Sequence, residues 1–381
     1  MNKFKFACII FFFFNVACKQ SSPNSAYLSI PQESQDLIHL SSLFQEVEII
    51  PIAGDPARIP NDLDKAMVSD QFMVVGDFTY SQSLYVIEME PWEIVPIPLQ
   101  KGEGPNEAKE VSDFWINNDF LYILDGIGRK ILPLKIEEGS FILQNPVPLE
   151  VPLRKFAKTE SGFVGLTGGG QDFALTFVNG NGKVTSTHLP FSIEYLMNPM
   201  NPFHQVNDGN LSMILLHTQL FPLIYRVDQD ELVEFKRFAF GSEALKIPEK
   251  TDYRLDQGGF DQFRTTLQSQ PSFFTLFEKT ANQFLLFHII NEVPKMALVD
   301  GDFGLTFRFQ NLKNDISFDQ PFPKVIGVNE DRFLAFVSRD QINHSMPEFK
   351  NSDLKSVIES NPEALSFLIQ FKLKVDGSTS N

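Results

Sequence analysis

The sequence is poor in cysteine, since Cys8 and Cys18 are the only two and both lie in the first 18 residues. Tyrosine and tryptophan are also scarce, at 7 and 2, whereas phenylalanine occurs 39 times. The chain after Cys18 therefore has no cysteine for a structural disulfide or a cysteine-ligated metal. Phenylalanine forms strands and packs between sheets without a polar atom to satisfy, which favours a core made of β-sheets.

Basic residues are outnumbered, with 32 Lys and Arg against 48 Asp and Glu, and the formal net charge is −16. A surface of this sign repels a phosphate backbone, so we expect no nucleic-acid partner. Convincing long amphipathic helices are also few. From about residue 44 onward, short runs rich in Phe, Val, Ile, Leu and Tyr alternate with turn residues.

The N-terminus has the layout of an export signal. A short basic end precedes the apolar run Phe6 to Phe14, which is too short to span a bilayer as a mature helix. The step Val16-Ala17-Cys18 resembles the end of a bacterial lipoprotein signal, in which the cysteine carries the lipid. We therefore predict a signal peptide at residues 1–17 and a lipidated Cys18 with a polar tether at 18–43; a plain secretory signal or a signal anchor is the alternative.

Groups of three or four short predicted strands recur roughly every 40–60 residues, which is the spacing of propeller blades. We predict an all-β fold, a six-bladed β-propeller over residues 44–376, with a repeated two-sheet sandwich as the alternative. The unpaired runs Glu46–Ile52 and Leu365–Lys374 would pair in the last blade, because this closes the ring and removes an exposed edge.

Two longer segments interrupt the strand groups, at residues 241–271 and 344–365. The run "SDLKSVIES" in the second is predicted to form a short helix capped by Ser352 or Asp353. Long loops on a rigid scaffold are common places for binding.

The stretch "KGEGPNEAKEV", residues 101–111, resembles a phosphate-binding loop at first sight. It has no Gly-Lys-Ser/Thr step, Pro105 removes an amide, and the carboxylates of Glu103 and Glu107 would repel phosphate. We therefore predict a connector between blades, in which the glycines supply unusual φ values and Glu107 accepts backbone amides.

A second turn, "LDGIGRKIL", places Asp125 at the end of a predicted strand and Arg129 beyond a glycine. One interpretation is that Asp125 pairs with Arg129 and fixes the turn. The other is that Arg129 contacts a ligand or partner.

Several segments together resemble a known family: "LFQEVEIIPIAG", the stretch from "KGEGPNEAKEV" to "FLYILD", and "SNPEALSFLIQFKL". They are similar, in this order, to the Bacteroidetes six-bladed β-propeller lipoproteins, which are TolB-like or NHL-like. The resemblance implies the propeller fold and an exported location. It supplies no catalytic residues.

Motifs for catalysis or metal binding are scarce. No G-x-S-x-G elbow occurs, and the six histidines include no i, i+4 pair. We therefore expect no catalytic residue, no metal and no cofactor.

We favour a non-enzymatic, lipid-anchored module of the cell envelope that binds an envelope protein or a glycan. We expect a monomer held at the membrane by its lipid, facing the periplasm rather than the cell surface. The alternatives are a carbohydrate-active enzyme, either a lyase or a glycoside hydrolase, and a structural subunit of an envelope complex. The candidate contact residues are Lys101, Glu103, Glu107, Asp125 and Arg129.

Overall fold

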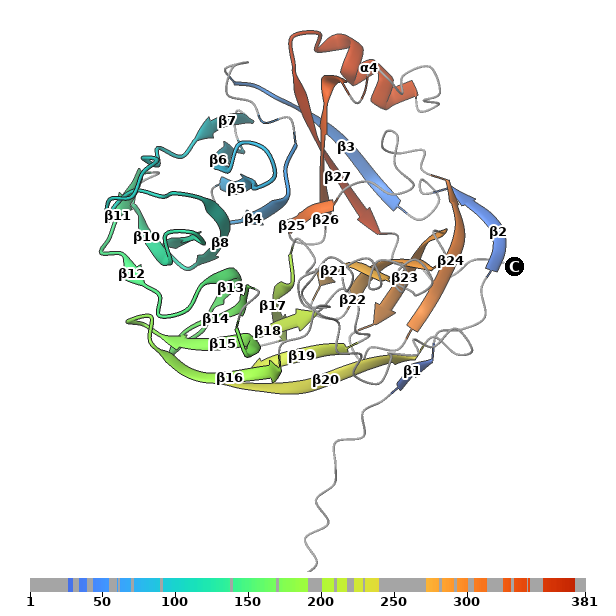
Figure 1. Ribbon diagram of the computed structural model, residues 1–381. Coiled ribbons are helices and arrows are strands. Elements are labelled where there is room, and N and C mark those ends of the chain that lie inside the picture. Colours follow the sequence, from blue (N-terminus) through green and yellow to red (C-terminus); the bar gives the residue numbers. More distant parts are fainter. Residues whose placement is uncertain are drawn as a thin grey trace, which may run out of the picture.

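The computed structural model has six β-sheets arranged as blades around a common axis (Figure 1). The predicted six-bladed β-propeller is therefore confirmed. The structure describes residues 27–29, 34–39, 44–54, 60, 62–69, 72–89, 92–137, 140–168, 171–190, 201–208, 211–217, 223–228, 230–239, 272–280, 283–290, 293–300, 305–313, 325–329, 332–340, 342 and 352–373.

The first three blades are antiparallel sheets built from consecutive strands. Blade 1 contains β4 (Lys65–Val68), β5 (Phe72–Asp77), β6 (Ser83–Glu88) and β7 (Glu93–Pro96). Blade 2 contains β8 (Val111–Asn117), β9 (Phe120–Asp125), β10 (Lys130–Glu137) and β11 (Ser140–Leu143), and β12 (Val147–Pro148) also pairs with β10. Blade 3 contains β13 (Leu153–Lys158), β14 (Gly162–Thr167), β15 (Phe173–Asn179) and β16 (Val184–Pro190).

The other three blades each include a strand from the N-terminal part of the chain. Blade 4 contains β17 (Phe203–Asp208), β18 (Leu211–His217), β19 (Leu223–Asp228), β20 (Glu231–Ala239) and β1 (Tyr27–Ser29). Blade 5 contains β21 (Ser272–Thr280), β22 (Gln283–Ile290), β23 (Val293–Asp300), β24 (Leu305–Lys313) and β2 (Ser34–His39). Blade 6 contains β25 (Val325–Asn329), β26 (Arg332–Ser338), β27 (Ser366–Leu373) and β3 (Phe44–Ile52).

The two ends of the propeller sequence close the ring, as predicted. Strand β3 pairs antiparallel with β27, with Phe44 opposite Leu373 and Ile52 opposite Ser366. The ring of Phe44 packs edge-on against Phe371, with the centroids 4.7 Å apart, and both rings are buried. The closed ring is therefore stabilised in blade 6 by two kinds of contact, the backbone hydrogen bonds between β3 and β27 and the packing of their aromatic rings.

Strands β1 and β2 were not expected from the sequence, because they lie in the segment predicted to be a tether. Strand β1 adds in parallel to β20, and β2 adds in parallel to β24, so each becomes the outer strand of its blade. Strands β1 and β2 thus lie along the outside of blades 4 and 5 (Figure 1). This pairing covers two sheet edges that would otherwise present unpaired amides and carbonyls.

The core lies between neighbouring blades. Each of three buried clusters joins residues of adjacent sheets, at the junctions of blades 6 and 1, 1 and 2, and 2 to 4. Every residue of β5 and of β14 is buried, because these strands are covered by a blade on both sides. Phenylalanine accounts for most of the largest fully buried side chains, which are Trp115, Phe44, Phe114, Phe156, Phe177, Phe333, Phe367 and Phe371.

The predicted short helix is present as α4 (Ser352–Ser360). The guanidinium of Arg339 donates to the carbonyls of Ile358, Asn361 and Ala364, and so satisfies carbonyls at the end of the helix. Within the described part of the chain, no helix is long and apolar enough to cross a membrane. Cys18 and the predicted insertion at 241–271 lie outside the described residues.

Candidate functional site

The innermost strands of the first three blades, β4, β8 and β13, begin at the same end of the ring. We call this end the top face. It contains these strand starts, the connector from β7 to β8 (residues 97–110), the β5–β6 turn (78–82) and the β9–β10 turn (126–129). Of the candidate residues predicted from the sequence, Lys101, Glu103 and Glu107 lie in the connector, Asp125 ends β9 and Arg129 lies in the β9–β10 turn.

The connector folds around the side chain of Glu107. Its carboxylate accepts a hydrogen bond from the amide of Gly104 at 2.9 Å, as predicted. A Cβ atom on Gly102 would lie 1.9 Å from Glu107 Oε2, and one on Gly104 would lie 3.0 Å from Glu107 Cδ. The glycines of the described chain with positive φ are Gly54 and Gly182, so the expectation of unusual φ values in the connector is wrong. Its glycines are needed because a carboxylate lies directly over them.

Two buried side chains of blade 2 hold the connector in place. Asp125 is fully buried, and its carboxylate accepts the amides of Lys109 at 2.9 Å, Glu110 at 3.2 Å and Gly128 at 2.7 Å. Lys130 donates to the carbonyl of Gly104 at 2.6 Å and lies 3.8 Å from the Asp125 carboxylate. One acid and one lysine thus fix both ends of the Gly104–Glu110 segment and the β9–β10 turn.

The sequence suggested an ion pair between Asp125 and Arg129, and this interpretation is wrong. The cation that pairs with Asp125 is Lys130, and the carboxylate fixes the turn through backbone amides. Arg129 has φ 52° and an exposed side chain, while its carbonyl accepts the amide of Leu149 at 2.7 Å. Gln82 has φ 50° at the matching position before β6 in blade 1, so this backbone geometry belongs to the turn. It leaves the Arg129 side chain projecting from the top face.

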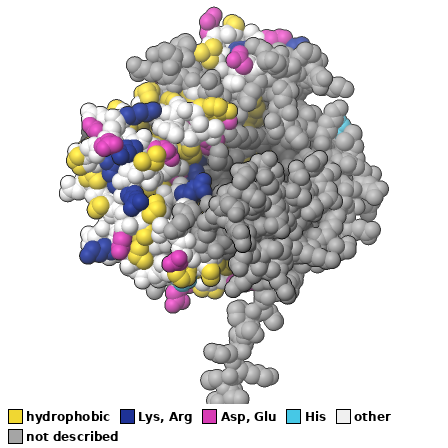
Figure 2. Space-filling model, viewed as in Figure 1, with side chains coloured by type: hydrophobic (Ala, Val, Ile, Leu, Met, Phe, Trp, Pro, Cys, Tyr) yellow, Lys and Arg dark blue, Asp and Glu magenta, His cyan; other side chains and the backbone are white. Residues whose placement is uncertain are grey.

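Two more candidates project from the connector. Lys101 is exposed and donates to the carbonyl of Ser81 at 3.2 Å. Glu103 is exposed and pairs with Lys109 at 2.7 Å; the hydrogen bond from Lys109 lowers the pKa of Glu103. Over the described blades, basic, acidic and apolar side chains are interspersed on the side of the ring in view (Figure 2). The connector therefore offers charges of both signs to a partner.

We expect Gly102→Ala to lower the free energy of unfolding by about 1–2 kcal/mol, because the new methyl displaces the Glu107 carboxylate and leaves the Gly104 amide without its acceptor. Urea denaturation measures this change. Gly180→Ala is the matched control, since no atom lies within 4 Å of a Cβ at that position. Equal stability of the two variants would contradict the role given to Glu107.

A small cavity adjoins the connector. It has a volume of about 40 Å³ and is lined by residues of β6, of the segment 97–101 and of the segment 108–111. A water molecule needs about 10–15 Å³ of such space. The cavity can hold water but not an organic ligand, so recognition at the connector would involve its surface.

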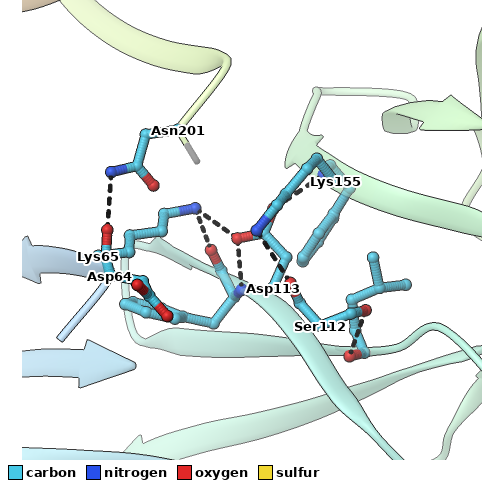
Figure 3. A network of polar contacts seen from close by, with 9 residues as sticks. Asp64, Lys65, Ser112, Asp113, Lys155 and Asn201 are labelled. Carbon is cyan, nitrogen blue, oxygen red and sulfur yellow. Dashed lines mark hydrogen bonds and ion pairs between the residues drawn. The ribbon is translucent and has the colours of Figure 1, made fainter. Parts of the chain in front are cut away.

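A second group of polar residues lies where the innermost strands begin (Figure 3). Lys65 at the start of β4 donates to Asp113 of β8 at 2.8 Å and to the Phe114 carbonyl at 2.6 Å. The other oxygen of Asp113 accepts the Phe156 amide of β13 at 3.0 Å. Lys65 and Asp113 are both buried, so this ion pair links the first strands of three blades.

Lys155 and Asn201 complete this group. Lys155 of β13 donates to the Ser112 carbonyl at 3.1 Å, and its ammonium lies 4.4 Å from the centre of the Phe78 ring. Desolvation by the surrounding protein lowers the pKa of Lys155, and the residue as a whole is half-buried. Asn201, just before β17, donates to the Asp64 carbonyl at 3.3 Å. These residues belong to four different blades, and reading the chain for motifs did not identify them.

The acids of this group are engaged in structural hydrogen bonds. Asp64 accepts the amides of Phe78 at 2.8 Å and Thr79 at 3.1 Å, and Asp113 is bonded to Lys65 and to two amides. A glycosidase requires two carboxylates that are able to exchange protons or attack the sugar. The arrangement therefore does not favour a glycoside hydrolase. Among the described residues, no group of three or more His, Cys, Asp or Glu could hold a metal ion.

Comparison with known proteins gives one family. The model of the family DUF5128, described as a 6-bladed beta-propeller, matches residues 19–335. No curated protein sequence matches this chain.

Among solved structures, a Bacteroides fragilis protein described as exported superposes with a TM-score of 0.70 at 17% identity, covering 91% of this chain and 99% of its own. A second structure, described as YCF48 bound to D1 peptide, gives a TM-score of 0.42 at 9% identity and covers 91% of this chain and 100% of its own. At these identities the likeness concerns the fold alone.

Proposed function

This chain belongs to the DUF5128 family of six-bladed β-propellers, and from that premise we propose that it is an exported, lipid-anchored binding module. Its top face would contact a protein of the cell envelope or a glycan. The contact residues would be the exposed charges Lys101, Glu103 and Arg129, with Glu107 and Asp125 holding the backbone that carries them.

The observation that carries this proposal is the fixed backbone beneath exposed charges. Buried Asp125 and Lys130 together make five polar contacts to the connector, to the turn and to each other. A surface that is ordered before binding loses less conformational entropy when a partner arrives. A recognition surface needs charged side chains on a rigid backbone. A segment that only links two blades does not need them.

Location is proposed from the N-terminus. The basic end, the apolar run and Cys18 fit a lipoprotein signal, and the solved structure from Bacteroides fragilis is described as that of an exported protein. Only residues 19–26 separate Cys18 from β1. An extended chain of this length reaches at most about 25–30 Å. The propeller would therefore lie close to the membrane, and we propose that it faces the periplasm.

We expect Arg129→Glu to reduce the capture of envelope material by the purified full chain at least about tenfold, because the substitution reverses an exposed charge of the proposed surface. Capture is measured by pull-down from detergent-solubilised envelopes and by binding to a glycan array. Lys135→Glu is the matched control, because Lys135 is a solvent-accessible basic residue near the other end of the same strand, β10.

Unchanged capture by Arg129→Glu, or equal loss in both variants, would contradict the proposal. Turnover of a captured glycan by the purified chain would instead support the carbohydrate-active alternative. Co-purification of a fixed multi-subunit assembly, independent of Arg129, would support the structural alternative.

A further inference from the structure

Large apolar side chains are exposed at the same kind of connection in three neighbouring blades. This connection joins the second strand of a blade to the third, and it carries Tyr80 in blade 1 and Ile127 in blade 2, with Phe173 directly after it in blade 3. Their exposed fractions are 69%, 59% and 37%. The innermost strands begin at the top face and each second strand runs antiparallel to its first, so all three connections lie on this face.

A buried polar side chain at the end of each second strand fixes the connection that follows. Asp77 at the end of β5 accepts the amide of Tyr80 at 2.8 Å, and Asp125 at the end of β9 holds the β9–β10 turn in the same way. Thr167 at the end of β14 donates its hydroxyl to the Phe173 carbonyl. All three are at most 2% exposed, so the backbone under the apolar side chains is anchored in the core.

An exposed cation accompanies each connection. Lys101 donates to the Ser81 carbonyl in blade 1, and Arg129 belongs to the turn of blade 2. In blade 3, Arg154 near the start of β13 lies beside the connection, since a Cβ atom on Gly168 would lie 3.6 Å from Arg154 Cδ. Within the described ranges, none of these three cations forms an ion pair.

The connections meet across the blade boundaries. A Cβ atom on Gly126 in blade 2 would lie 3.3 Å from the carbonyl oxygen of Leu153 in blade 3. The ring of Phe78 in the blade 1 turn lies 4.4 Å from the ammonium of Lys155 in blade 3. The three apolar side chains and the three cations therefore belong to one continuous part of the top face, which we call the three-turn surface.

We infer that the three-turn surface binds a protein segment that carries both large apolar and acidic side chains. The apolar side chains of the segment would pack on Tyr80, Ile127 and Phe173, and its carboxylates would pair with Lys101, Arg129 and Arg154. This inference rests on the proposed function, because it gives the chemistry of a protein partner of the top face.

The shape and composition of this surface favour a protein over a glycan. The cavity beside the connector, at about 40 Å³, does not enclose a sugar ring, and the apolar side chains stand on turns. Exposed aromatic and arginine side chains are typical of the residues that contribute most to protein–protein binding. The unpaired cations complement an acidic segment and would repel a basic one.

The acids of the surface argue against insertion into a lipid bilayer. Asp172 is exposed directly before Phe173, and Glu103 is exposed two residues after Lys101. Insertion of the apolar side chains would bring these carboxylates toward the lipid, where a charge is costly. A protein interface can leave them in the solvated rim.

Selection of a random-peptide library displayed on phage against the purified full chain tests the inference. We expect the enriched peptides to combine Phe, Leu or Trp with Asp or Glu. A synthetic copy of the most enriched peptide should bind in a fluorescence-anisotropy titration. The triple variant Tyr80→Ser, Ile127→Ser and Phe173→Ser should weaken this binding about tenfold or more, because it removes the apolar contacts.

The charges are tested separately. Replacing both Arg129 and Arg154 by Gln should remove most of the preference for the enriched peptide over a copy with Asn and Gln in place of its acids. An unchanged preference would show that the cations do not select acidic segments and would overturn that part of the inference.

The double variant Val95→Ser and Ile142→Ser is the matched control for the apolar substitutions. These side chains are 41% and 44% exposed, and they lie on the outer strands β7 and β11 of blades 1 and 2. The control should bind the peptide within about twofold of the unmodified chain. Thermal melting checks that each variant is folded, and Tyr80→Ser with Ile127→Ser serves if the triple variant is not.

Enrichment of basic or purely polar peptides, the absence of any enriched peptide, or equal binding by the triple variant would overturn the inference. Glycan binding that the triple variant loses would assign the surface to a glycan instead. A fluorophore at position 80 that enters vesicles of phosphatidylethanolamine and phosphatidylglycerol would assign it to the membrane. Either result would overturn the inference.

Failure of the inference is distinct from failure of the proposed function. If Arg129→Glu abolishes envelope capture while the triple variant captures as the unmodified chain does, the inference alone fails. If the unmodified chain captures no envelope protein and no glycan, the proposed function fails.

Discussion

Replacing Lys65 by methionine is expected to lower the free energy of unfolding by about 3–5 kcal/mol, because it leaves the buried Asp113 carboxylate without its counter-ion. Lys65 is 6% exposed and Asp113 is 1% exposed, so water cannot replace the lost ammonium without opening the strand starts. The Phe114 carbonyl loses its bond to Lys65 as well. Urea denaturation gives the change, with the m-value checked for constancy.

Lys155→Met is the contrasting control in the same place. Lys155 is desolvated, and its contacts are a carbonyl and a ring, so its removal should cost little or stabilise the protein. The double variant Lys65→Met with Asp113→Asn should recover part of the loss, because the amide still accepts a backbone N–H without a buried charge. A loss below about 1 kcal/mol in Lys65→Met would contradict the role given to this pair.

Replacing Asp125 by alanine is expected to destabilise the protein by about 3–5 kcal/mol, because three backbone amides lose their shared acceptor. The bonds to Lys109 and Glu110 hold the connector, and the bond to Gly128 holds the β9–β10 turn. Amide hydrogen exchange in residues 101–110 should rise together with the loss measured in urea.

Asp119→Ala is the control for this variant, because Asp119 is an exposed acid in the β8–β9 turn of the same blade. It should change the stability by no more than about 0.5 kcal/mol. Intact exchange protection of the connector in Asp125→Ala would show that another group holds it.

The propeller was predictable from the sequence because its strands are short, occur in groups and are separated by strong turn signals. The closing pair of β3 and β27 was also predictable, since each run lacked a neighbour in sequence and each would expose an edge. The helix α4 followed from its capping residue. The connector was identified as structural because Pro105 and its glutamates are incompatible with phosphate.

The parallel additions of β1 and β2 could not be predicted in this way. Their residues, "YLS" and "SQDLIH", are short and partly polar, and they resemble a tether. What selects them is the free outer edge of β20 and of β24, which exists only once blades 4 and 5 have formed.

The group around Lys65 was also beyond a reading along the chain. Lys65 and Asp113 are 48 residues apart, and Phe156 lies 43 residues beyond Asp113. A weak signal exists, because a charged residue stands within the first three residues of the innermost strand in "DKAM", "SDFW" and "RKFA". This signal can be recognised only when the blades are superposed on one another.

Arg129 illustrates how a residue can be singled out by a turn although the partner expected for it is wrong. The glycine turn pointed to it, but its expected partner Asp125 is instead bonded to backbone amides and to Lys130. Losing that partner strengthens the binding interpretation, because the Arg129 side chain is exposed on a backbone that other residues already fix.

The central claim is that the top face of this propeller binds a partner in the cell envelope. Photo-crosslinking in intact cells tests it most directly, with a photoreactive amino acid placed at position 129 of the full chain and, separately, at position 135. The account predicts a defined adduct from position 129 and none from position 135. Adducts from position 135 alone, or equal adducts from both positions, would contradict it.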